Sequence, residues 1–347
     1  MSGGVDSSVA AAILKRAGVE VIGVFMKFWL EPGKDGLVGA WNRCCSPEAE
    51  KRARQVAVIL DIPFYVFNFE KEFKKRIVDY FLDEYKAGRT PNPCVVCNKE
   101  IKFGLLLEKT LSLNADFIAT GHYTRIKKKK DSIHLLRAKD KNKDQSYFLW
   151  QLDQNQLKHI LFPVGDYTKS QVRNLAKKFK LPVSKTPESM EICFIQTTVN
   201  DFLKRYLKPK PGKIITLERR TIGQHQGLPF YTIGQRKGIE LPGGPYYVVD
   251  KNLKENLLVV TKNERDLFKK ELIVKKVNWI SGKTPKLPLK IKARIRYRHT
   301  LTSAIITKKL KTKTYLLNFD KSQRAITPGQ SVVFFKNDEV LGGGIIS

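Results

Sequence analysis

The sequence predicts an α/β domain with a mostly parallel sheet, followed by a small central domain and an all-β C-terminal domain. In the first half, apolar strands alternate with amphipathic helices, which is typical of repeated β-α-β units. Near Leu207 the character of the sequence changes, and "KPKPGK" has the composition of a linker before helical periodicity fades from Ile214 on. From Ile214 onward, short apolar strands between glycine-rich turns predict a small barrel or sandwich.

The first half divides into alternating helices and strands. Residues 9–16 read as a helix that stops at Gly18, and the continuous apolar run 19–29 reads as a strand buried on both faces. In "CCSPEAEKRARQVAVIL", Ser46 is suited to cap a helix whose first residue is Pro47. "IPFYVFNF" predicts the next strand, and a helix rich in Glu, Phe and Lys follows it.

The remaining elements follow in the same way. In "TPNPCVVCNKEIKFGLLLEK" we expect a helix to begin near Asn98, and "ADFIAT" reads as another buried strand. "KKKKDS" predicts an exposed turn between two strands, and Thr168 with Gln171 forms the capping-box pattern of a helix. "GGPYYVVD", "KIKARIRYRH", "KTYLLNF" and "SVVFFKNDEVLGGGII" read as strands of the C-terminal part.

Length and charge limit the classes of function. The chain has 347 residues, enough for two or three domains, and we expect these at 1–206, 207–273 and 274–347. Sixty-four Lys and Arg against 33 Asp and Glu give a net charge of +31, which favours a polyanionic partner, although a lysine-rich proteome would also produce such a surface. No apolar run is long enough to span a membrane, and the polar first residues lead us to expect no signal peptide. The five cysteines then favour a cytoplasmic protein with reactive or metal-binding thiols.

The opening "MSGGVDSSVAAAILKRAG" carries the strongest single motif. Glycines let the backbone approach a phosphate, and serine hydroxyls and the amide groups at a helix N-terminus attract anions. The pattern is not that of the P-loop in kinases and GTPases; it matches S-G-G-x-D-S, the pyrophosphate-binding loop of enzymes that cleave ATP between the α and β phosphates. Asp6 is the expected neighbour of Mg²⁺ or the pyrophosphate. An ordinary Gly-Ser turn that caps a helix is the simpler alternative.

Such a loop is expected to follow a buried first strand, and this chain begins at the loop. A central parallel strand would satisfy backbone groups of its neighbours and anchor the loop. We therefore expect the start of the natural chain about ten residues upstream, the length of a strand with its lead-in, so that Met1 would be an internal methionine.

The cysteines fall into three groups. Cys94 and Cys97 form a C-x-x-C pair, which can be redox-active, can supply two metal ligands or can be incidental. The position of Cys97 just before the expected helix start favours a thiolate. Cys193 lies 96 residues later in an apolar context typical of a core thiol. Cys44 and Cys45 are adjacent, and we expect a structural or peripheral role for them.

Taken together, the motifs resemble one family, the bacterial tRNA-uridine 2-sulfurtransferases (tRNA-specific 2-thiouridylases, MnmA family). The resemblance runs from Met1 to Ser347. The segments that carry it include "SGGVDSS", "GVFMKFW", "CCSPEAEKRAR", "TPNPCVVCNKEIKFG", "TGHYTRI", "KDQSYFLW", "FPVGDYTKSQVR", "ESMEICFI", "GQHQGLPFYTIGQRKG", "IRYRH" and "PGQSVVFFKNDEVLGGGII". It implies an adenine-nucleotide α-hydrolase-like (PP-loop ATPase) domain, a small central domain and a C-terminal β-barrel.

The resemblance also implies a mechanism. ATP would adenylate the carbon-2 oxygen of the wobble uridine, position 34, and a persulfide on Cys193 would deliver sulfur, with Cys97 as the partner thiol and a Cys97–Cys193 disulfide left for reduction. Water must be excluded from such an adenylate. The implied nucleotide pocket consists of Met1, Ser2, Gly3, Gly4, Val5, Asp6, Ser7 and Ser8 with Met26 and Gly121. The implied cofactors are ATP and Mg²⁺. The implied partners are the tRNAs for Lys, Glu and Gln and a cysteine desulfurase or sulfur-relay protein.

The implied tRNA contacts are polar, basic or aromatic residues, which suit phosphate binding and stacking on an unpaired base. They are Asn92, Pro93, Cys94, His122, Lys143, Asp144, Gln145, Arg296, Tyr297 and Gln330. By itself, "IRYRH" would read as the solvated face of a strand with alternating charge.

Three alternatives remain open at this level. Cys94, Cys97 and Cys193 together could hold an iron–sulfur cluster, which is a different route for the sulfur. An amide-forming synthetase shares the opening loop but has no need of Cys193 or of a basic β domain. An RNA-binding module without catalysis has no need of the loop or of the C-x-x-C pair.

Overall fold

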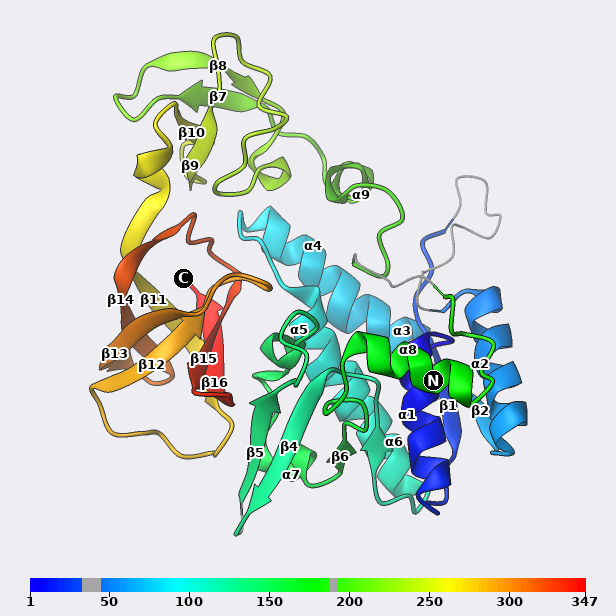
Figure 1. Cartoon of the computed structure of the whole chain (residues 1–347). Coiled ribbons are helices and arrows are strands. Elements are labelled where there is room, and N and C mark those ends of the chain that lie inside the picture. Colours follow the sequence, from blue (N-terminus) through cyan, green and yellow to red (C-terminus); the bar gives the residue numbers. More distant parts are fainter. Residues whose placement is uncertain (33–44, 131, 187–191) are drawn as a thin grey trace.

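The computed structural model describes residues 1–32, 45–130, 132–186 and 192–347, and it has three parts (Figure 1). The α/β part lies beside the C-terminal β domain, and the central domain lies above both. The helices of the α/β part and its connection are α1 (Val5–Arg16), α2 (Pro47–Leu60), α3 (Glu70–Phe73), α4 (Asp79–Lys86), α5 (Pro93–Cys97), α6 (Leu106–Ser112), α7 (Gln154–Leu157), α8 (Lys169–Lys178) and α9 (Val199–Tyr206). Two π-helical segments, η1 (Lys74–Val78) and η2 (Asn98–Leu105), join α3 to α4 and α5 to α6, and a 3-10 turn η3 spans Ser146–Leu149.

The parallel strands of the α/β part form two pairs. β1 (Gly23–Lys27) pairs with β2 (Phe64–Asn68), and β3 (Ile118–Ala119) pairs with β6 (Ile160–Leu161). Among the residues described, no ladder joins one pair to the other. β4 (Thr124–Lys129) and β5 (Ser132–Arg137) form an antiparallel hairpin, as predicted from the basic turn between them.

Most of the helices agree with their sequence signals. Ser46 accepts a hydrogen bond from the backbone of Ala49 at the start of α2, and the capping box of Thr168 and Gln171 opens α8. Two predicted starts are wrong. α1 begins at Val5, directly after the glycine pair. α5 begins at Pro93 with Asn92 as its cap, so the helix starts before the C-x-x-C pair and not near Asn98.

The central domain is a four-stranded sheet in the order β8-β7-β10-β9. Its strands are β7 (Gly212–Ile215), β8 (Thr221–His225), β9 (Tyr247–Asn252) and β10 (Leu257–Thr261), with 3-10 turns η4 (Leu228–Phe230) and η5 (Glu264–Leu267). β7 and β10 are parallel, and the other pairings are antiparallel.

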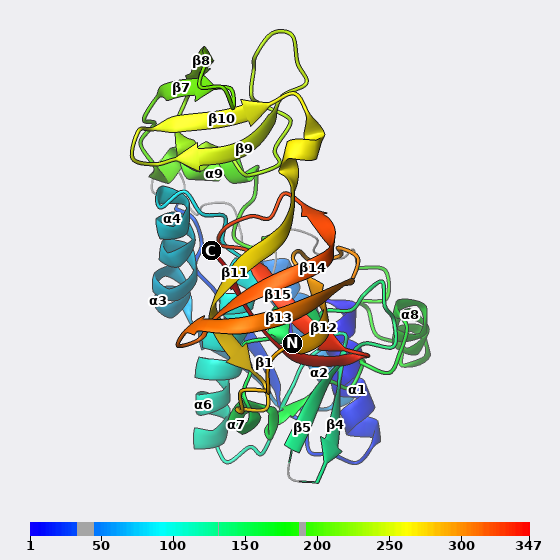
Figure 2. The same ribbon diagram turned by 90° about the vertical axis from the view of Figure 1, so that its left-hand side faces the viewer.

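The C-terminal domain is a closed barrel, and Figure 2 shows its strands in front of the α/β part. Its strands are β11 (Phe268–Trp279), β12 (Leu289–Arg294), β13 (Thr302–Lys311), β14 (Thr314–Arg324), β15 (Ser331–Lys336) and β16 (Glu339–Ile346). Pairing of β11 with β16 closes the barrel, and Leu136 of β5 pairs with Glu339, which joins the barrel to the α/β part. "IRYRH" is not a strand face: β12 ends at Arg294, and the chain turns there.

Two apolar cores hold the domains together. One contains Phe73 and Phe81 of the α/β part and Ile214 and Leu258 of the central domain. The other combines residues of the α/β part with Phe335 of the barrel. Burial of apolar surface therefore fixes both C-terminal domains against the α/β part. None of the helices described is long and apolar enough to cross a membrane.

Candidate active site and tRNA surface

The opening loop is held by its own serines and by α2. The backbone N–H of Ser2 donates to Ser7 Oγ at 3.1 Å, and the two hydroxyl oxygens lie 3.2 Å apart. Gly3 has φ +69°, and a Cβ at this position would lie 2.2 Å from the Ala49 carbonyl oxygen. Arg52 Nε donates to the Gly3 carbonyl at 3.1 Å. Only glycine fits here, because α2 packs directly on the backbone of the loop.

The residues of the predicted nucleotide loop are not equally accessible. Ser8 is fully buried, and its hydroxyl donates to the Gly4 carbonyl at 2.9 Å. Met1 packs among apolar residues, and its amino group donates to the Val24 carbonyl. The accessible members are Ser2, Gly4, Asp6 and Ser7. They surround the N-terminus of α1, where unpaired N–H groups and the helix dipole favour an anion.

Asp6 is the centre of a charged cluster that joins three distant segments. Lys169 Nζ lies 2.6 and 2.7 Å from the two Asp6 carboxylate oxygens, and the Tyr123 hydroxyl donates to Asp6 Oδ1 at 2.7 Å. Gly121 follows β3, and a Cβ there would lie 2.6 Å from the Asp6 backbone carbon. Lys169 is 9% exposed. The sequence interpretation missed Lys169, although it stands in "FPVGDYTKSQVR", one of the quoted segments.

Met26 and Gly121 lie at corresponding ends of two parallel pairs. Met26 is half-buried near the carboxyl end of β1, and Gly121 comes shortly after the carboxyl end of β3. In open α/β sheets ligands bind outside the carboxyl ends of the strands. These positions are consistent with a nucleotide pocket beside the N-terminus of α1.

His122 is a neutral side chain in an aromatic setting. Its ring lies 5.8 Å from Phe103 and 6.1 Å from Phe162, measured between centroids. Nδ1 is 2.9 Å from Thr120 Oγ1. Burial, together with the charge of Lys102, holds the pKa of His122 well below its ordinary value, so the ring is uncharged near neutral pH.

The structure brings Cys97 and Cys193 to one apolar cluster. Cys97 is 8% exposed at the end of α5 and belongs to the cluster of Phe73 and Phe81. Cys193 is half-buried and packs against the same cluster. The ring centroid of its neighbour Phe194 lies 5.9 Å from that of Phe73 and 5.4 Å from that of Phe81. These ring contacts fix the Cys193 turn against α3 and α4.

Cys45 belongs to the same apolar cluster as this pair, whereas Cys94 is not among its members. Cys94 is exposed in the first turn of α5. The dipole argument made for Cys97 applies better to Cys94, because the effect falls off within the first turn. Cys45 is buried with its Sγ 3.8 Å from the Phe28 carbonyl oxygen, and Cys44 lies outside the described residues.

The described thiols do not converge as a metal-ligand set. Within the described parts of the chain, no three His, Cys, Asp or Glu side chains converge as a metal-ligand set. An iron–sulfur cluster on Cys94, Cys97 and Cys193 stays a prediction; it would need all three thiolates at bonding distance from the metal.

A basic pocket of about 380 Å³ lies between the α/β part and the barrel. Its lining brings two of the predicted tRNA-contact segments together and adds three basic residues to them. The lining residues are Lys141, Asn142, Lys143, Asp144, Arg294, Tyr297 and Arg298. Arg294 and Arg298 were not among the predicted contacts, although their neighbours Arg296 and Tyr297 were.

Asp144 is a buried carboxylate in the lining of this pocket, and it contacts two arginines. It is 2% exposed and accepts hydrogen bonds from Arg137 Nε at 3.1 Å and from the Ala138 N–H at 3.2 Å. Arg294 Nη1 lies 3.6 Å from Asp144 Oδ2, the same oxygen that Arg137 Nε contacts. This buried carboxylate therefore holds two guanidinium groups in place.

Three further predicted tRNA contacts also have internal partners. Gln145 Oε1 accepts from the Tyr123 N–H at 2.9 Å. Arg296 donates to the Ala325 carbonyl at 2.9 Å and to the Thr327 hydroxyl. Gln330 donates to backbone carbonyls of the segment before α5.

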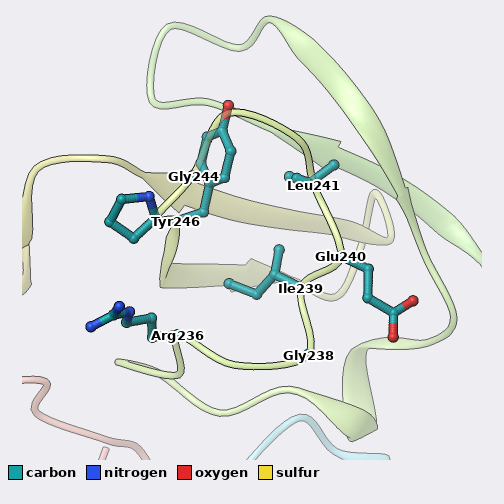
Figure 3. Close-up of a pocket in the computed structure, with 8 residues that line it drawn as sticks. Arg236, Gly238, Ile239, Glu240, Leu241, Gly244 and Tyr246 are labelled. Atoms are coloured by element: carbon teal, nitrogen blue, oxygen red, sulfur yellow. The ribbon is translucent and has the colours of Figure 1, made fainter.

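A second pocket, of about 400 Å³, lies within the central domain (Figure 3). The turn from Arg236 to Tyr246 lines it, and Ile239 forms its buried wall. Arg236 and Tyr246 border one side of the hollow, and Leu241 and Glu240 border the other. It contains none of the predicted site residues.

Comparison with known proteins gives the family. Three family models match in order: tRNA methyl transferase HUP domain at residues 1–197, tRNA methyl transferase PRC-barrel domain at 200–262, and aminomethyltransferase beta-barrel domain at 269–346. The chain is 45% identical over 356 residues to a tRNA-specific 2-thiouridylase MnmA of Streptococcus sanguinis (strain SK36), covering 100% of this chain and 93% of the relative. The chain belongs to the tRNA-specific 2-thiouridylase family.

Other members agree with this assignment. A 2-thiouridylase MnmA of Clostridioides difficile (strain 630) is 46% identical and one of Thermoanaerobacter sp. (strain X514) is 48% identical, each covering 100% of this chain and 96% of the relative. Among solved structures, an NMN synthetase from Francisella tularensis is 17% identical with a TM-score of 0.33, covering 54% of this chain and 63% of that chain, which is too distant to support an argument.

Membership confirms the predicted fold class and enzyme class. The HUP domain, the PRC-barrel domain and the closed barrel correspond to the predicted α/β, central and C-terminal β parts. The chain is a 2-thiouridylase, a sulfurtransferase that modifies uridine in tRNA. The predicted site residues and domain boundaries stay predictions.

Proposed function

We propose that the chain uses ATP to activate the wobble uridine of tRNA and then replaces the oxygen on carbon 2 with sulfur carried by Cys193. The observation that carries the proposal is the shared apolar cluster of Cys97 and Cys193, two thiols 96 residues apart in sequence. An amide-forming synthetase or an RNA-binding module has no need of such a pair.

The activation step uses the N-terminus of α1. The phosphates of ATP bind the loop N–H groups and the hydroxyls of Ser2 and Ser7, with Lys169 as the nearby positive charge. Asp6 is suited to hold Mg²⁺ together with the phosphates, because Mg²⁺ is normally bound by one or two carboxylates plus substrate phosphates. The uridine carbon-2 oxygen attacks the α phosphorus and pyrophosphate leaves, so that carbon 2 now carries AMP as a leaving group.

Sulfur transfer uses the two clustered thiols. The terminal sulfur of a Cys193 persulfide attacks carbon 2, and AMP departs with its bonding electrons. The Cys97 thiolate then attacks Cys193 Sγ, which breaks the bond to the transferred sulfur and forms a Cys97–Cys193 disulfide. An external thiol reduces this disulfide, and a cysteine desulfurase or sulfur-relay protein supplies the next sulfur. We expect the apolar surroundings of Cys97 to help exclude water that would hydrolyse the adenylate.

The basic pocket is the proposed place where tRNA phosphates bind. Lys143, Arg294 and Arg298 line it, and Tyr297 offers an aromatic face for stacking. The proposed substrates are the tRNAs for Lys, Glu and Gln. We propose that residues 1–206 carry out catalysis, and that residues 274–347 bind RNA together with the segment around Lys143.

Nucleoside mass spectrometry tests this function. Unmodified tRNA is incubated with the protein, ATP, Mg²⁺, cysteine and a cysteine desulfurase. The expected result is 2-thiouridine that depends on ATP and disappears in Cys193→Ala and Cys97→Ala. Cys45→Ala, which removes a buried thiol of the same apolar cluster with no proposed role in the transfer, should retain it. Equal product from Cys193→Ala and the unmodified protein would refute the assignment of the sulfur carrier.

A further inference from the structure

The segment between α4 and α5 is held from both C-terminal domains. The Thr90 N–H donates to the Pro328 carbonyl in the barrel at 2.9 Å. Thr90 Oγ1 lies 3.3 Å from Thr232 Oγ1 in the central domain. One residue, three positions before the first turn of α5, thus touches both domains that follow the α/β part.

Gln330 makes the strongest of these attachments. Its Nε2 donates to the Thr90 carbonyl at 2.9 Å and to the Pro91 carbonyl at 3.1 Å, which uses both amide hydrogens. The neighbouring Gly329 has φ +92°, and a Cβ there would lie 2.9 Å from both the N and the O of Thr90. The backbones of barrel and segment are therefore in direct contact, and no side chain fits between them.

A second connection runs through a buried tyrosine. Tyr147 is fully buried, and its hydroxyl donates to the Ser331 carbonyl at 2.8 Å. Burial raises the pKa of Tyr147, and the Asn92 side chain acts on the same hydroxyl in the opposite sense. Asn92 Oδ1 in turn accepts from the Val95 N–H at 3.4 Å and caps α5. Two consecutive barrel residues, Gln330 and Ser331, are thus linked to Thr90, Pro91 and Asn92.

We infer that Gln330 is a positioning residue for α5, acting through the Thr90 and Pro91 backbone to set the place of the Cys97 thiol. The inference rests on the proposed role of Cys97 as partner thiol. It assigns to the amide group of Gln330 a task different from the tRNA contact that the family resemblance implies. The C-terminal barrel then helps to build the active site as well as to bind RNA.

The variant Gln330→Glu tests this directly. Glutamate has the same length but offers no N–H and places a carboxylate against two carbonyl oxygens. We expect kcat for 2-thiouridine formation to fall at least about tenfold while the Kd for tRNA stays within about twofold. In protein without tRNA, the rate at which iodoacetamide alkylates Cys97, followed by peptide mass spectrometry, should change at least about threefold.

Gln323→Glu is the matched control. Gln323 lies on β14 of the same barrel and donates within its own strand, to the Lys321 carbonyl at 2.7 Å. The variant Gln323→Glu introduces the same charge into the same domain, and it should alter neither kcat nor the rate of Cys97 alkylation. If Gln330→Glu does not fold, Tyr147→Phe breaks the second connection, and the same change in Cys97 alkylation is expected.

The opposite pattern overturns the inference. A weakened tRNA Kd with an unchanged Cys97 alkylation rate would make Gln330 a direct RNA contact. Unchanged kcat and unchanged alkylation would also refute it. A third result separates the two proposals. If the protein with Gln330 intact makes no 2-thiouridine, but Gln330→Glu still alters the rate of Cys97 alkylation, the proposed function is refuted and the positioning role remains.

Discussion

The pairing of Asp6 with Lys169 decides the charge of the nucleotide loop. A carboxylate beside the N-terminus of α1 would repel phosphate if nothing neutralised it. Lys169 lies within 2.7 Å of both carboxylate oxygens and is mostly shielded from water. In the proposed nucleotide site, the ion pair leaves the loop without the repulsion of an unpaired carboxylate, so that the helix dipole can attract an ATP phosphate.

The variant Lys169→Met removes the charge and keeps the length of the side chain. We expect the KM for ATP to rise about tenfold or more, and the free energy of unfolding to fall by about 1–3 kcal/mol because Asp6 loses its partner. Steady-state kinetics and urea unfolding measure the two effects. Lys177 is an exposed lysine of the same helix. Lys177→Met should leave the KM for ATP unchanged and alter the free energy of unfolding by no more than a few tenths of a kcal/mol. Equal ATP KM in the two variants would contradict this role for Lys169.

His122 makes stability depend on pH. Its pKa in the folded protein is held well below 6.5, so the unfolded chain takes up the proton first as the pH falls. The stabilisation is complete above about pH 6.5 and is lost as the pH falls towards the lowered pKa. In His122→Asn, the slope of unfolding free energy below pH 6 should be smaller by up to about 1.4 kcal/mol per pH unit. Identical slopes in the two proteins would show that His122 does not titrate in this way.

At the scale of elements, the contact between the opening loop and α2 depends on one glycine. Gly3→Ala would place a Cβ 2.2 Å from the Ala49 carbonyl oxygen at a positive φ. We expect a loss of about 2–4 kcal/mol in stability and a large loss of ATP affinity, because strain and overpacking add. Thermal unfolding and ATP titration measure these effects.

Gly18→Ala is the control for backbone strain alone. Gly18 also has a positive φ, +78°, but nothing lies within 4 Å of its would-be Cβ. We expect Gly18→Ala to lower the free energy of unfolding by about 1–2 kcal/mol and to leave the affinity for ATP unchanged. If both variants bind ATP equally well, the packing of α2 on the loop does not shape the nucleotide site.

The elements also separate what sequence can predict from what it cannot. The caps of α2 and α8 were predictable because Ser46 and Thr168 bond to their own first turns. The start of α1 was not, because Gly4 caps it without a side-chain bond and Asp6 is a weak helix former. For α5 the signal was present: Asn92 as cap and Pro93 at the first position are ordinary start signals.

The whole molecule adds contacts that no local pattern encodes. The grouping of Cys97 with Cys193 depends on Phe194 packing between α3 and α4. The basic pocket depends on the barrel meeting the α/β part, with Asp144 buried between Arg137 and Arg294. The sequence named these segments through family resemblance, whereas their placement follows from tertiary packing.

The basic pocket predicts the salt dependence of tRNA binding. Each phosphate contact that is lost lowers the slope of log K against log salt by about 0.7–0.9. In Arg298→Gln we expect weaker binding at low salt and a slope smaller by about that amount, measured by filter binding over a salt series. Arg219→Gln is the control, since this arginine is 71% exposed in its side chain and pairs with Glu255 in the central domain. A slope unchanged in Arg298→Gln would place the tRNA phosphates elsewhere.

The central claim is that Cys193 carries the sulfur and Cys97 releases it. The most direct measurement is a single turnover with iron-free protein that has been loaded with radiolabelled sulfur by a desulfurase and then separated from it. After addition of ATP, Mg²⁺ and tRNA, the account predicts labelled 2-thiouridine, at most one per loaded protein, and a Cys97–Cys193 disulfide in the peptide mass spectrum. Loaded protein that transfers no label until iron and sulfide are restored would contradict it.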